Sequence, residues 1–189
     1  MISSHRRRIL GAAAALSLVQ GKIVIAQSLP PTPACGKQTP SQTAGPFFKP
    51  NSPERTSLLE KSANAPRLVL SGVVLSRDCK PVPNALLDFW HADEEGDYDN
   101  KGFRYRGHQH ADAQGRWRLE TILPAEYPGR TRHIHVNVQA PGKRVLTTQL
   151  YFPGERDNAR DGLYRKELEI RDFKKGDALA GDFDFVVDI

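Results

Sequence analysis

Long apolar runs, long helical repeats and cysteines are all scarce in this sequence of 189 residues. The main apolar stretch near the start, 9–19, is too short to span a bilayer and is followed by Gln20-Gly21-Lys22. No segment places apolar residues every three or four positions over the length of a helix. These absences argue against a stable membrane span and against a helical bundle.

Net charge is also small once the N-terminus is set apart. The chain carries +5 overall, but residues 1–26 contain four basic residues and no acid, which leaves only +1 for the remainder. A surface that binds nucleic acid needs a basic stripe to neutralise phosphates. We therefore expect no nucleic acid among the partners of this protein.

Residues 1–26 have the three parts of an export signal in the expected order. A basic start, Arg6-Arg7-Arg8, precedes the apolar stretch 9–19, and the small residue Ala26 suits a cleavage site. The adjacent arginines, followed directly by Ile9, resemble the twin-arginine signal, an address read by a receptor. We expect a periplasmic or extracellular protein, with an ordinary secretory signal as the alternative route.

The two cysteines of the chain are Cys35 and Cys79. An even pair in an exported protein favours a disulfide, which would tie the N-terminal part of the chain to the first hairpin. Spacing alone cannot pair cysteines, so two unbridged thiols stay the alternative. No spacing of cysteine and histidine typical of zinc occurs.

The rest of the chain divides into an arm and a β-rich region. Residues 27–50 are interpreted as an extended arm, because six prolines there disfavour helix and central strand alike. Beyond Pro66, short apolar or alternating runs are separated by residues typical of tight turns. This pattern predicts an all-β fold, an antiparallel β-sandwich in a single domain over residues 51–189. Six strands are predicted, at 67–75, 85–92, 116–122, 133–140, 145–152 and 182–188.

The segment that begins with His133 carries the first chemical signal. Side chains of a strand alternate between its faces, so His133 and His135 share one face, while Ile134, Val136 and Val138 share the other. Two neutral imidazoles about 7 Å apart along a strand can converge on a metal ion. An isolated pair of this kind more often lies on a solvent-facing strand, so the surrounding residues decide the interpretation.

Two tyrosines with distinctive neighbours precede these histidines. Tyr98 ends the segment Trp90-His91-Ala92-Asp93-Glu94-Glu95-Gly96-Asp97-Tyr98, and Tyr127 starts Tyr127-Pro128-Gly129-Arg130. In order, the chain therefore contains WxAxxxGxY, Tyr-Pro and RxxHxH. In these motifs the sequence resembles the intradiol ring-cleaving dioxygenases, which act on catechol and protocatechuate. Segments 41–47 and 146–152 extend the resemblance over about residues 40–155.

The resemblance implies a metal centre and a reaction. One non-haem Fe(III) per chain would be bound by Tyr98 and His135 as equatorial ligands and by Tyr127 and His133 as axial ligands. Phenolate oxygens are hard anionic ligands that suit ferric iron. A catechol would displace Tyr127 and a bound hydroxide, and dioxygen would then open the ring to a muconate-type diacid. The implied role is the catabolism of aromatic compounds.

Further residues take roles from the same resemblance. Arg130 would bind the substrate and stabilise charge on its ring, and Gln149 would lie near the axial ligands. Tyr127 would take up a substrate proton, and Gly45 and Pro46 would line the substrate entrance. The implied partners are a catechol-type small molecule and dioxygen. The sequence does not determine which catechol is the substrate. It also leaves the oligomeric state open, and a homodimer is one of the alternatives.

Several neighbouring residues are expected to lie outside this chemistry. His108 and His110 are interpreted as structural or pocket-lining, and His91 as solvent-facing or close to the ligands. The acidic pair Glu94-Glu95, beside Asp93, is expected to lie on a solvated loop without a catalytic role. Arg132 should point away from the histidines. The loop between Tyr127 and His133 is shorter than the family's, which predicts a more open site.

Two other functions fit parts of the sequence. A non-catalytic, exported binding module of the transthyretin-like kind would share the β-sandwich, but it has no need for two such tyrosines, Arg130 and convergent histidines together. A zinc-dependent hydrolase would need a carboxylate at ligand spacing beside His133 and His135, and none occurs there. We therefore expect a dioxygenase and keep the binding module as the alternative.

Overall fold

A computed structural model of the chain describes residues 36–189. The predicted export signal, the start of the proline-rich arm and Cys35 lie outside the described residues. Cys79 is disulfide-bonded. Among residues 36–189, no helix is long and apolar enough to cross a bilayer.

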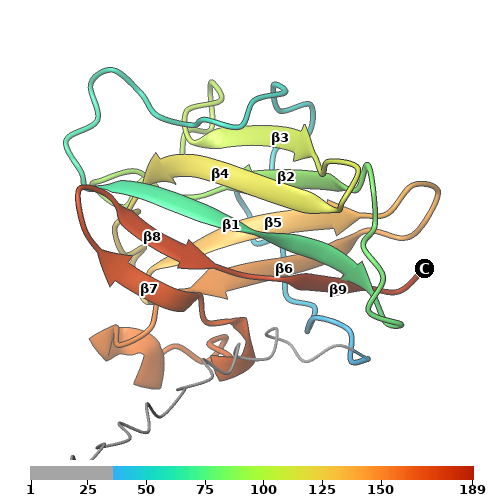
Figure 1. The fold of residues 1–189 in the computed structure, drawn as a ribbon. Coiled ribbons are helices and arrows are strands. Elements are labelled where there is room, and N and C mark those ends of the chain that lie inside the picture. The colour runs from blue at the N-terminus through green and yellow to red at the C-terminus, as the bar shows by residue number, and fades with distance from the viewer. Residues whose placement is uncertain (1–35) are drawn as a thin grey trace, which may run out of the picture.

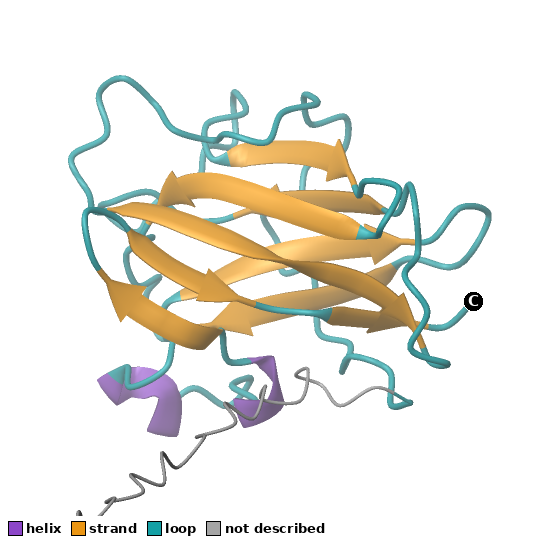
Figure 2. Cartoon of the chain, viewed as in Figure 1, coloured by secondary structure: helices purple, strands orange, loops and turns teal. Residues whose placement is uncertain are grey.

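The described chain forms two sheets packed face to face, which confirms the predicted β-sandwich (Figures 1 and 2). One sheet has the order β4-β1-β8-β7, with β9 also paired to β1, and the other has the order β3-β2-β5-β6. The strands are β1 (Arg67–Ser76), β2 (Leu86–Trp90), β3 (Arg106–His110), β4 (Arg116–Ile122), β5 (His133–Gln139), β6 (Leu146–Tyr151), β7 (Arg171–Lys175), β8 (Leu179–Asp182) and β9 (Phe185–Val187). Two short 3-10 helices, η1 (Arg156–Ala159) and η2 (Lys166–Leu168), follow β6.

The core lies between the sheets and is built by alternation along the strands. Leu87 and Phe89 of β2 and Ile134, Val136 and Val138 of β5 are all fully buried there. Each such side chain contributes about 1.5–3 kcal/mol by leaving water. The residues between them in sequence therefore face the outer surface of the four-stranded sheet, which is where the histidines of β5 lie.

Three strands were not predicted: β3, β7 and β8. Their sequences lack apolar alternation, because β3 and β7 lie at the ends of their sheets and β8 contains Gly181. The strand predicted at 182–188 is interrupted, because the chain leaves β8 at Asp182 and re-enters pairing as β9. At this break the Phe183 carbonyl lies against Gly72, and a Cβ at Gly72 would lie 1.8 Å from the Phe183 carbonyl oxygen.

Most strand pairings are antiparallel as predicted, but β8 and β9 both run parallel to β1.

Residues 36–66 form an arm whose middle part, residues 42–55, crosses the outer face of the four-stranded sheet. The Gln42 amide donates to the Thr147 carbonyl of β6 at 2.8 Å, and the Arg55 amide donates to the His108 carbonyl of β3 at 2.8 Å. These two strands are the opposite edges of that sheet. The arm between these contacts therefore covers the face on which the β5 histidines lie.

Candidate metal centre

The outer face of the four-stranded sheet carries a cluster of aromatic and polar side chains. Register places Trp90 of β2 beside His135 of β5, and His135 beside Gln149 of β6. His133 is paired with Tyr151 in the same way. Period-two alternation therefore brings these five residues onto one surface beneath the arm.

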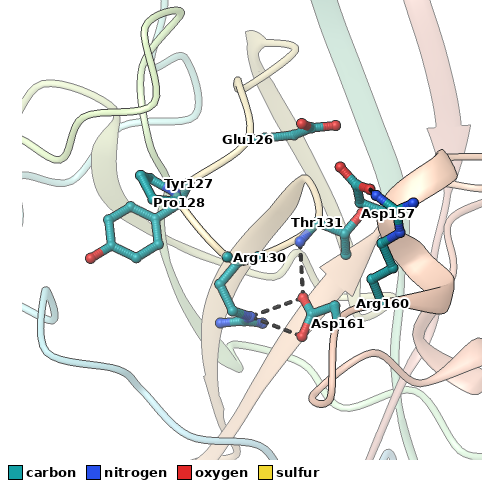
Figure 3. Close-up of a pocket in the computed structure, with 9 residues that line it drawn as sticks. Glu126, Tyr127, Pro128, Arg130, Thr131, Asp157, Arg160 and Asp161 are labelled. Atoms are coloured by element: carbon teal, nitrogen blue, oxygen red, sulfur yellow. Dashed lines mark hydrogen bonds and ion pairs between the residues drawn. The ribbon is translucent and has the colours of Figure 1, made fainter.

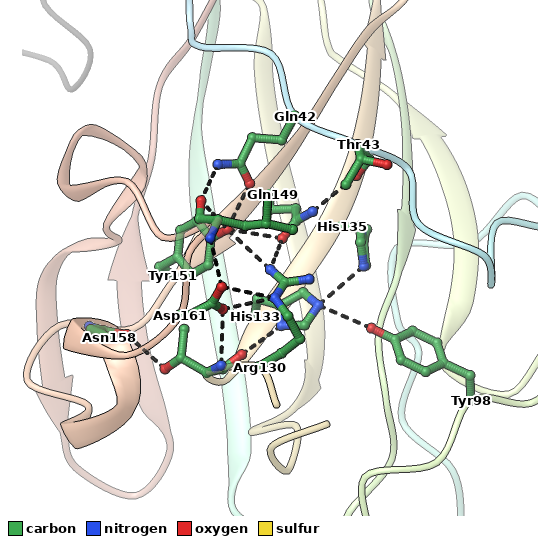
Figure 4. Close-up of polar contacts among 12 residues, drawn as sticks. Gln42, Thr43, Tyr98, Arg130, His133, His135, Gln149, Tyr151, Asn158 and Asp161 are labelled. Carbon is green, nitrogen blue, oxygen red and sulfur yellow. Dashed lines mark hydrogen bonds and ion pairs between the residues drawn. The ribbon is translucent and has the colours of Figure 1, made fainter. Parts of the chain in front are cut away.

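Three of the four predicted ligands converge at this surface (Figure 4). The Tyr98 hydroxyl lies 3.3 Å from His133 Nε2, and His133 Nε2 lies 3.2 Å from His135 Nε2. His133 Nδ1 lies 2.6 Å from the Thr131 carbonyl, so Nδ1 carries the hydrogen and Nε2 presents a lone pair. Two imidazole nitrogens and a phenol oxygen thus surround one point.

Burial keeps both imidazoles neutral. It lowers the pKa of His133 to about 4 and the pKa of His135 well below its usual value. His135 Nδ1 is also buried and has no hydrogen-bond partner among the described residues. Neutral imidazole nitrogens and a phenol oxygen that converge on one buried position can all act as ligands of a metal cation. Because a phenolate oxygen is a hard ligand, these three residues fit ferric iron.

The turn before Tyr98 explains how this residue reaches the centre. Asp93 Oδ1 accepts hydrogen bonds from the amides of Glu95 at 3.0 Å and Asp97 at 2.8 Å, which closes the turn. Gly96 has φ +93, and a Cβ there would meet the Glu126 carbonyl oxygen at 2.5 Å. Only glycine suits this position. Of the acidic pair expected on a solvated loop, Glu95 is exposed and Glu94 is half-buried, whereas Asp93 beside them is buried and fixes the Tyr98 turn.

Tyr98 packs on an aromatic ring and lies close to two cations. Phe47 of the arm stacks on its ring with centroids 4.6 Å apart. Burial raises the pKa of the Tyr98 hydroxyl, and the positive charges of Arg130 and Arg106 oppose that rise. A phenol in this environment needs a metal cation to lose its proton at neutral pH.

Tyr127 lies beside the other three predicted ligands without joining them. Its ring meets the Tyr98 ring edge-on, with centroids 5.9 Å apart, and its hydroxyl has no hydrogen-bond partner within residues 36–189. It also lines a cavity of about 450 Å³ between residues 126–131 and η1 (Figure 3). A half-buried tyrosine next to an open cavity has room to rotate.

The two arginines of the RxxHxH segment point to different places. Arg130 Nη2 donates to Gln149 Oε1 at 2.7 Å, and Gln149 Nε2 donates to the Thr43 carbonyl of the arm at 2.9 Å. Arg132 instead pairs with Glu155 at 3.3 Å, away from the histidines. Arg130 and Gln149 thus belong to the site, and Arg132 does not.

The arm forms the other wall of the centre. Gly45 has φ +69, and a Cβ there would lie 3.5 Å from His135 Cε1. Pro46 next to it is exposed. The Trp90 ring stacks on a face of the His135 imidazole, with centroids 4.9 Å apart and planes at 5°. The His135 ring is therefore fixed between the arm and β2.

The remaining histidines have structural surroundings. His91 is buried rather than solvent-facing, and its ring nitrogens lie 2.7 Å from the Ala92 carbonyl and 2.7 Å from Thr121 Oγ1. His108 lies on β3 beside Ser52 of the arm at 3.1 Å. His110 lies 3.5 Å from Glu54 at the same edge.

The sequence analysis did not identify Phe47 as a residue of the site, although Phe47 lies in segment 41–47.

Comparisons with known proteins agree with this geometry. A family model described as "Dioxygenase" matches residues 43–185. The chain belongs to the intradiol dioxygenase family. This dioxygenase-family chain is 31% identical over 146 residues to catechol 1,2-dioxygenase of Acinetobacter baylyi, covering 62% of this chain and 47% of that protein. It is 32% identical over 151 residues to the protocatechuate 3,4-dioxygenase beta chain of Burkholderia cepacia, covering 64% of each.

A solved structure supports the same family. The dioxygenase domain of a dioxygenase carbohydrate-binding protein fusion from Streptomyces sp. SirexAA-E is 53% identical, with a TM-score of 0.79. The alignment covers 81% of this chain and 99% of that domain. By contrast, the chain spans only about half the length of the Acinetobacter baylyi catechol dioxygenase.

Proposed function

We propose that this chain is a ferric dioxygenase that cleaves a catechol-type ring between its two hydroxyl-bearing carbons. Both atoms of dioxygen would enter a muconate-type diacid. The observation that carries the proposal is the convergence of the Tyr98 hydroxyl with Nε2 of His133 and of His135, at a buried point, in a chain of this family.

In this proposal Tyr98, His133 and His135 hold the iron, one per chain, and Tyr127 supplies the fourth side chain after a rotation of its ring. Ferric iron, when bound, supplies the Lewis acidity and redox chemistry that allow a catechol to react with dioxygen. Burial keeps both imidazoles neutral, and the Thr131 carbonyl fixes the tautomer of His133. The two imidazoles are thus ready to bind before the metal arrives, whereas the tyrosines bind as they lose their protons to it.

The other residues of the centre act on the catechol. Arg130 places a positive charge beside the His133 ring, where it stabilises negative charge on the bound substrate. If the metal held Tyr127 as a phenolate, the Tyr127 oxygen, which has no competing hydrogen bond among the described residues, would take the proton of a catechol hydroxyl and leave as the neutral phenol. Phe47 and Trp90 exclude water from two sides of the centre. A non-catalytic binding module has no need for this arrangement.

The first test is the colour of the purified protein. Tyrosinate bound to ferric iron absorbs visible light, so we expect a red to brown protein with about one iron per chain. Tyr98→Phe should lose most of that absorption while keeping the fold. A wild-type protein that stayed colourless after reconstitution with Fe(III) would contradict the proposal.

The second test is oxygen uptake with catechol, protocatechuate and hydroxyquinol, with the diacid products identified by mass. Uptake with at least one of them is expected, and its absence with all three would favour a binding module.

We also propose that the chain is exported through the twin-arginine route, and this proposal rests on residues 1–26 alone. Recovery of the processed protein outside the cytoplasm would test this.

A further inference from the structure

Asp161 is a buried acid close to the proposed centre that the chemistry above does not use. It follows η1 in the chain, and its side chain is 1% exposed. Oδ1 accepts from Arg130 Nε at 3.0 Å and from the Leu163 amide at 2.8 Å. Oδ2 accepts from Arg130 Nε at 2.9 Å and from the Thr131 amide at 3.0 Å. Both oxygens are therefore fully engaged with the Arg130 segment and with the chain around Leu163 (Figure 4).

Arg130 is held on two sides by these and other contacts. Nε is bound to Asp161, and Nη2 is bound to Gln149 Oε1 at 2.7 Å and to the Tyr151 hydroxyl at 3.3 Å. Nη1 has no hydrogen bond to any residue in 36–189. In Figure 4 the guanidinium nitrogen without a dashed line points to the side on which His135 and Tyr98 lie.

We infer that Asp161 is a positioning residue, which fixes Arg130 so that Nη1 faces a catechol bound at the metal centre. This inference rests on the proposed function. A guanidinium is planar and rigid, so fixing Nε and Nη2 also fixes the direction of Nη1. Asp161 holds the backbone as well, because it binds the Thr131 amide next to Arg130.

The cavity beside Tyr127 shows why Arg130 needs this support. Both Arg130 and Asp161 line that cavity of about 450 Å³ (Figure 3). Without the carboxylate, the guanidinium could swing into the cavity and toward solvent, away from the metal centre. Residues 126–131 line one side of this cavity, and Asp157, Arg160 and Asp161 line the other. Asp161 therefore holds the guanidinium from the side opposite the loop that carries it.

Asp161→Asn is the decisive variant, because it keeps the shape but replaces one accepting oxygen with a donating amide. Each oxygen accepts from Arg130 Nε and from a backbone amide, so in either orientation the new amide faces two donors. Arg130 Nε therefore loses one of its two acceptors and its negatively charged partner. We expect kcat/KM for catechol to fall by about tenfold or more, with iron content and the visible band unchanged. Asp157→Asn is the matched control, since Asp157 lies on η1 and forms only a 3.7 Å surface pair with Arg160. It should stay within about twofold of wild type.

A double-variant cycle separates positioning from folding. In an Arg130→Ala background, Asp161→Asn should cause no further loss if Asp161 acts through Arg130. An equal loss with and without Arg130 would show that Asp161 acts on the fold instead, and this would overturn the inference. Arg130→Lys keeps Asp161 and the charge but lacks the planar fork. We expect it to lose about as much activity as Arg130→Ala, and full activity would also refute the inference.

A measurement that needs no catalytic turnover tests the positioning role of Asp161 separately from the proposed dioxygenase activity. In protein loaded with diamagnetic Ga(III), the Arg130 Nε–H should give a proton resonance slowed in exchange by its carboxylate partner, and Asp161→Asn should abolish that protection. An Arg130 signal that exchanges equally fast in wild type and variant would overturn the positioning role. Absence of oxygen uptake by wild-type protein would count only against the proposed dioxygenase activity.

Discussion

His91 makes the free energy of unfolding depend on pH in a way that can be calculated from its surroundings. The ring is 1% exposed, lies between the Ala92 carbonyl and Thr121 Oγ1, and stacks on Tyr105 with centroids 5.1 Å apart. Burial lowers its pKa from 6.5 to about 4. In the unfolded chain the ring returns to water and to its ordinary pKa, so protonation favours the unfolded state.

The size and sign of the effect follow from this difference. Because the folded pKa is the lower one, the contribution of His91 is complete above about pH 6.5 and is lost as the pH falls toward about 4. One pKa unit corresponds to about 1.4 kcal/mol, so the loss from this one residue approaches about 3 kcal/mol across that window. Between these limits the slope is about 1.4 kcal/mol per pH unit.

Urea unfolding of metal-free protein at several values between pH 7 and pH 4 would measure this slope. His91→Gln has no group that titrates there, so the stability gap between wild type and variant should narrow by about 2–3 kcal/mol as the pH falls. His133 is present in both proteins, so its contribution to the pH dependence of the unfolding free energy largely cancels in the comparison. A gap that stayed constant from pH 7 to pH 4 would refute the assignment of a buried, neutral His91.

Two further predictions concern the metal centre. Trp90→Leu removes the ring that stacks on the His135 imidazole, so iron affinity should fall by about tenfold in competition with a chelator while the fold, followed by circular dichroism, is kept. An unchanged affinity would mean that the stacking does not orient the ligand. Arg130→Ala should keep iron and colour but reduce turnover by about a hundredfold or more, whereas Arg132→Ala, which removes the pair with Glu155 and the hydrogen bond to the Pro124 carbonyl, should change turnover little. Equal and small effects on oxygen uptake would exclude a role for either arginine.

The parts of the site that depend on local spacing could be predicted from sequence. Alternation along a strand puts His133 and His135 on one face whatever the rest of the fold does. The turn before Tyr98 is equally local, since Asp93 and Gly96 lie within five residues of it. Family resemblance then supplied the metal and the reaction, which spacing alone does not determine.

The parts that depend on distant segments could not be predicted. Asp161 lies 28 residues after His133 and has no motif around it, so only the folded chain reveals that it binds Arg130. The position of Tyr127 depends on the conformation of a short loop, which composition does not fix. Strands such as β3 and β7 were missed because edge strands need not alternate apolar and polar residues.

The pairing of the two ends of the described chain has a consequence for folding kinetics. β9 is the last strand and runs parallel to β1, while the Thr39 amide at the start of the arm donates to the Val186 carbonyl of β9 at 3.0 Å. The pairing of β9 with β1 joins Val74 to Phe185, and the arm contact joins residues 147 positions apart. Closing such long loops costs entropy before any contact compensates for it. The Thr39 end of the arm is thus secured only after β9 has been synthesised and docked. Nascent chains on the ribosome would lack a finished centre, and refolding should be slow compared with that of helical proteins of this size.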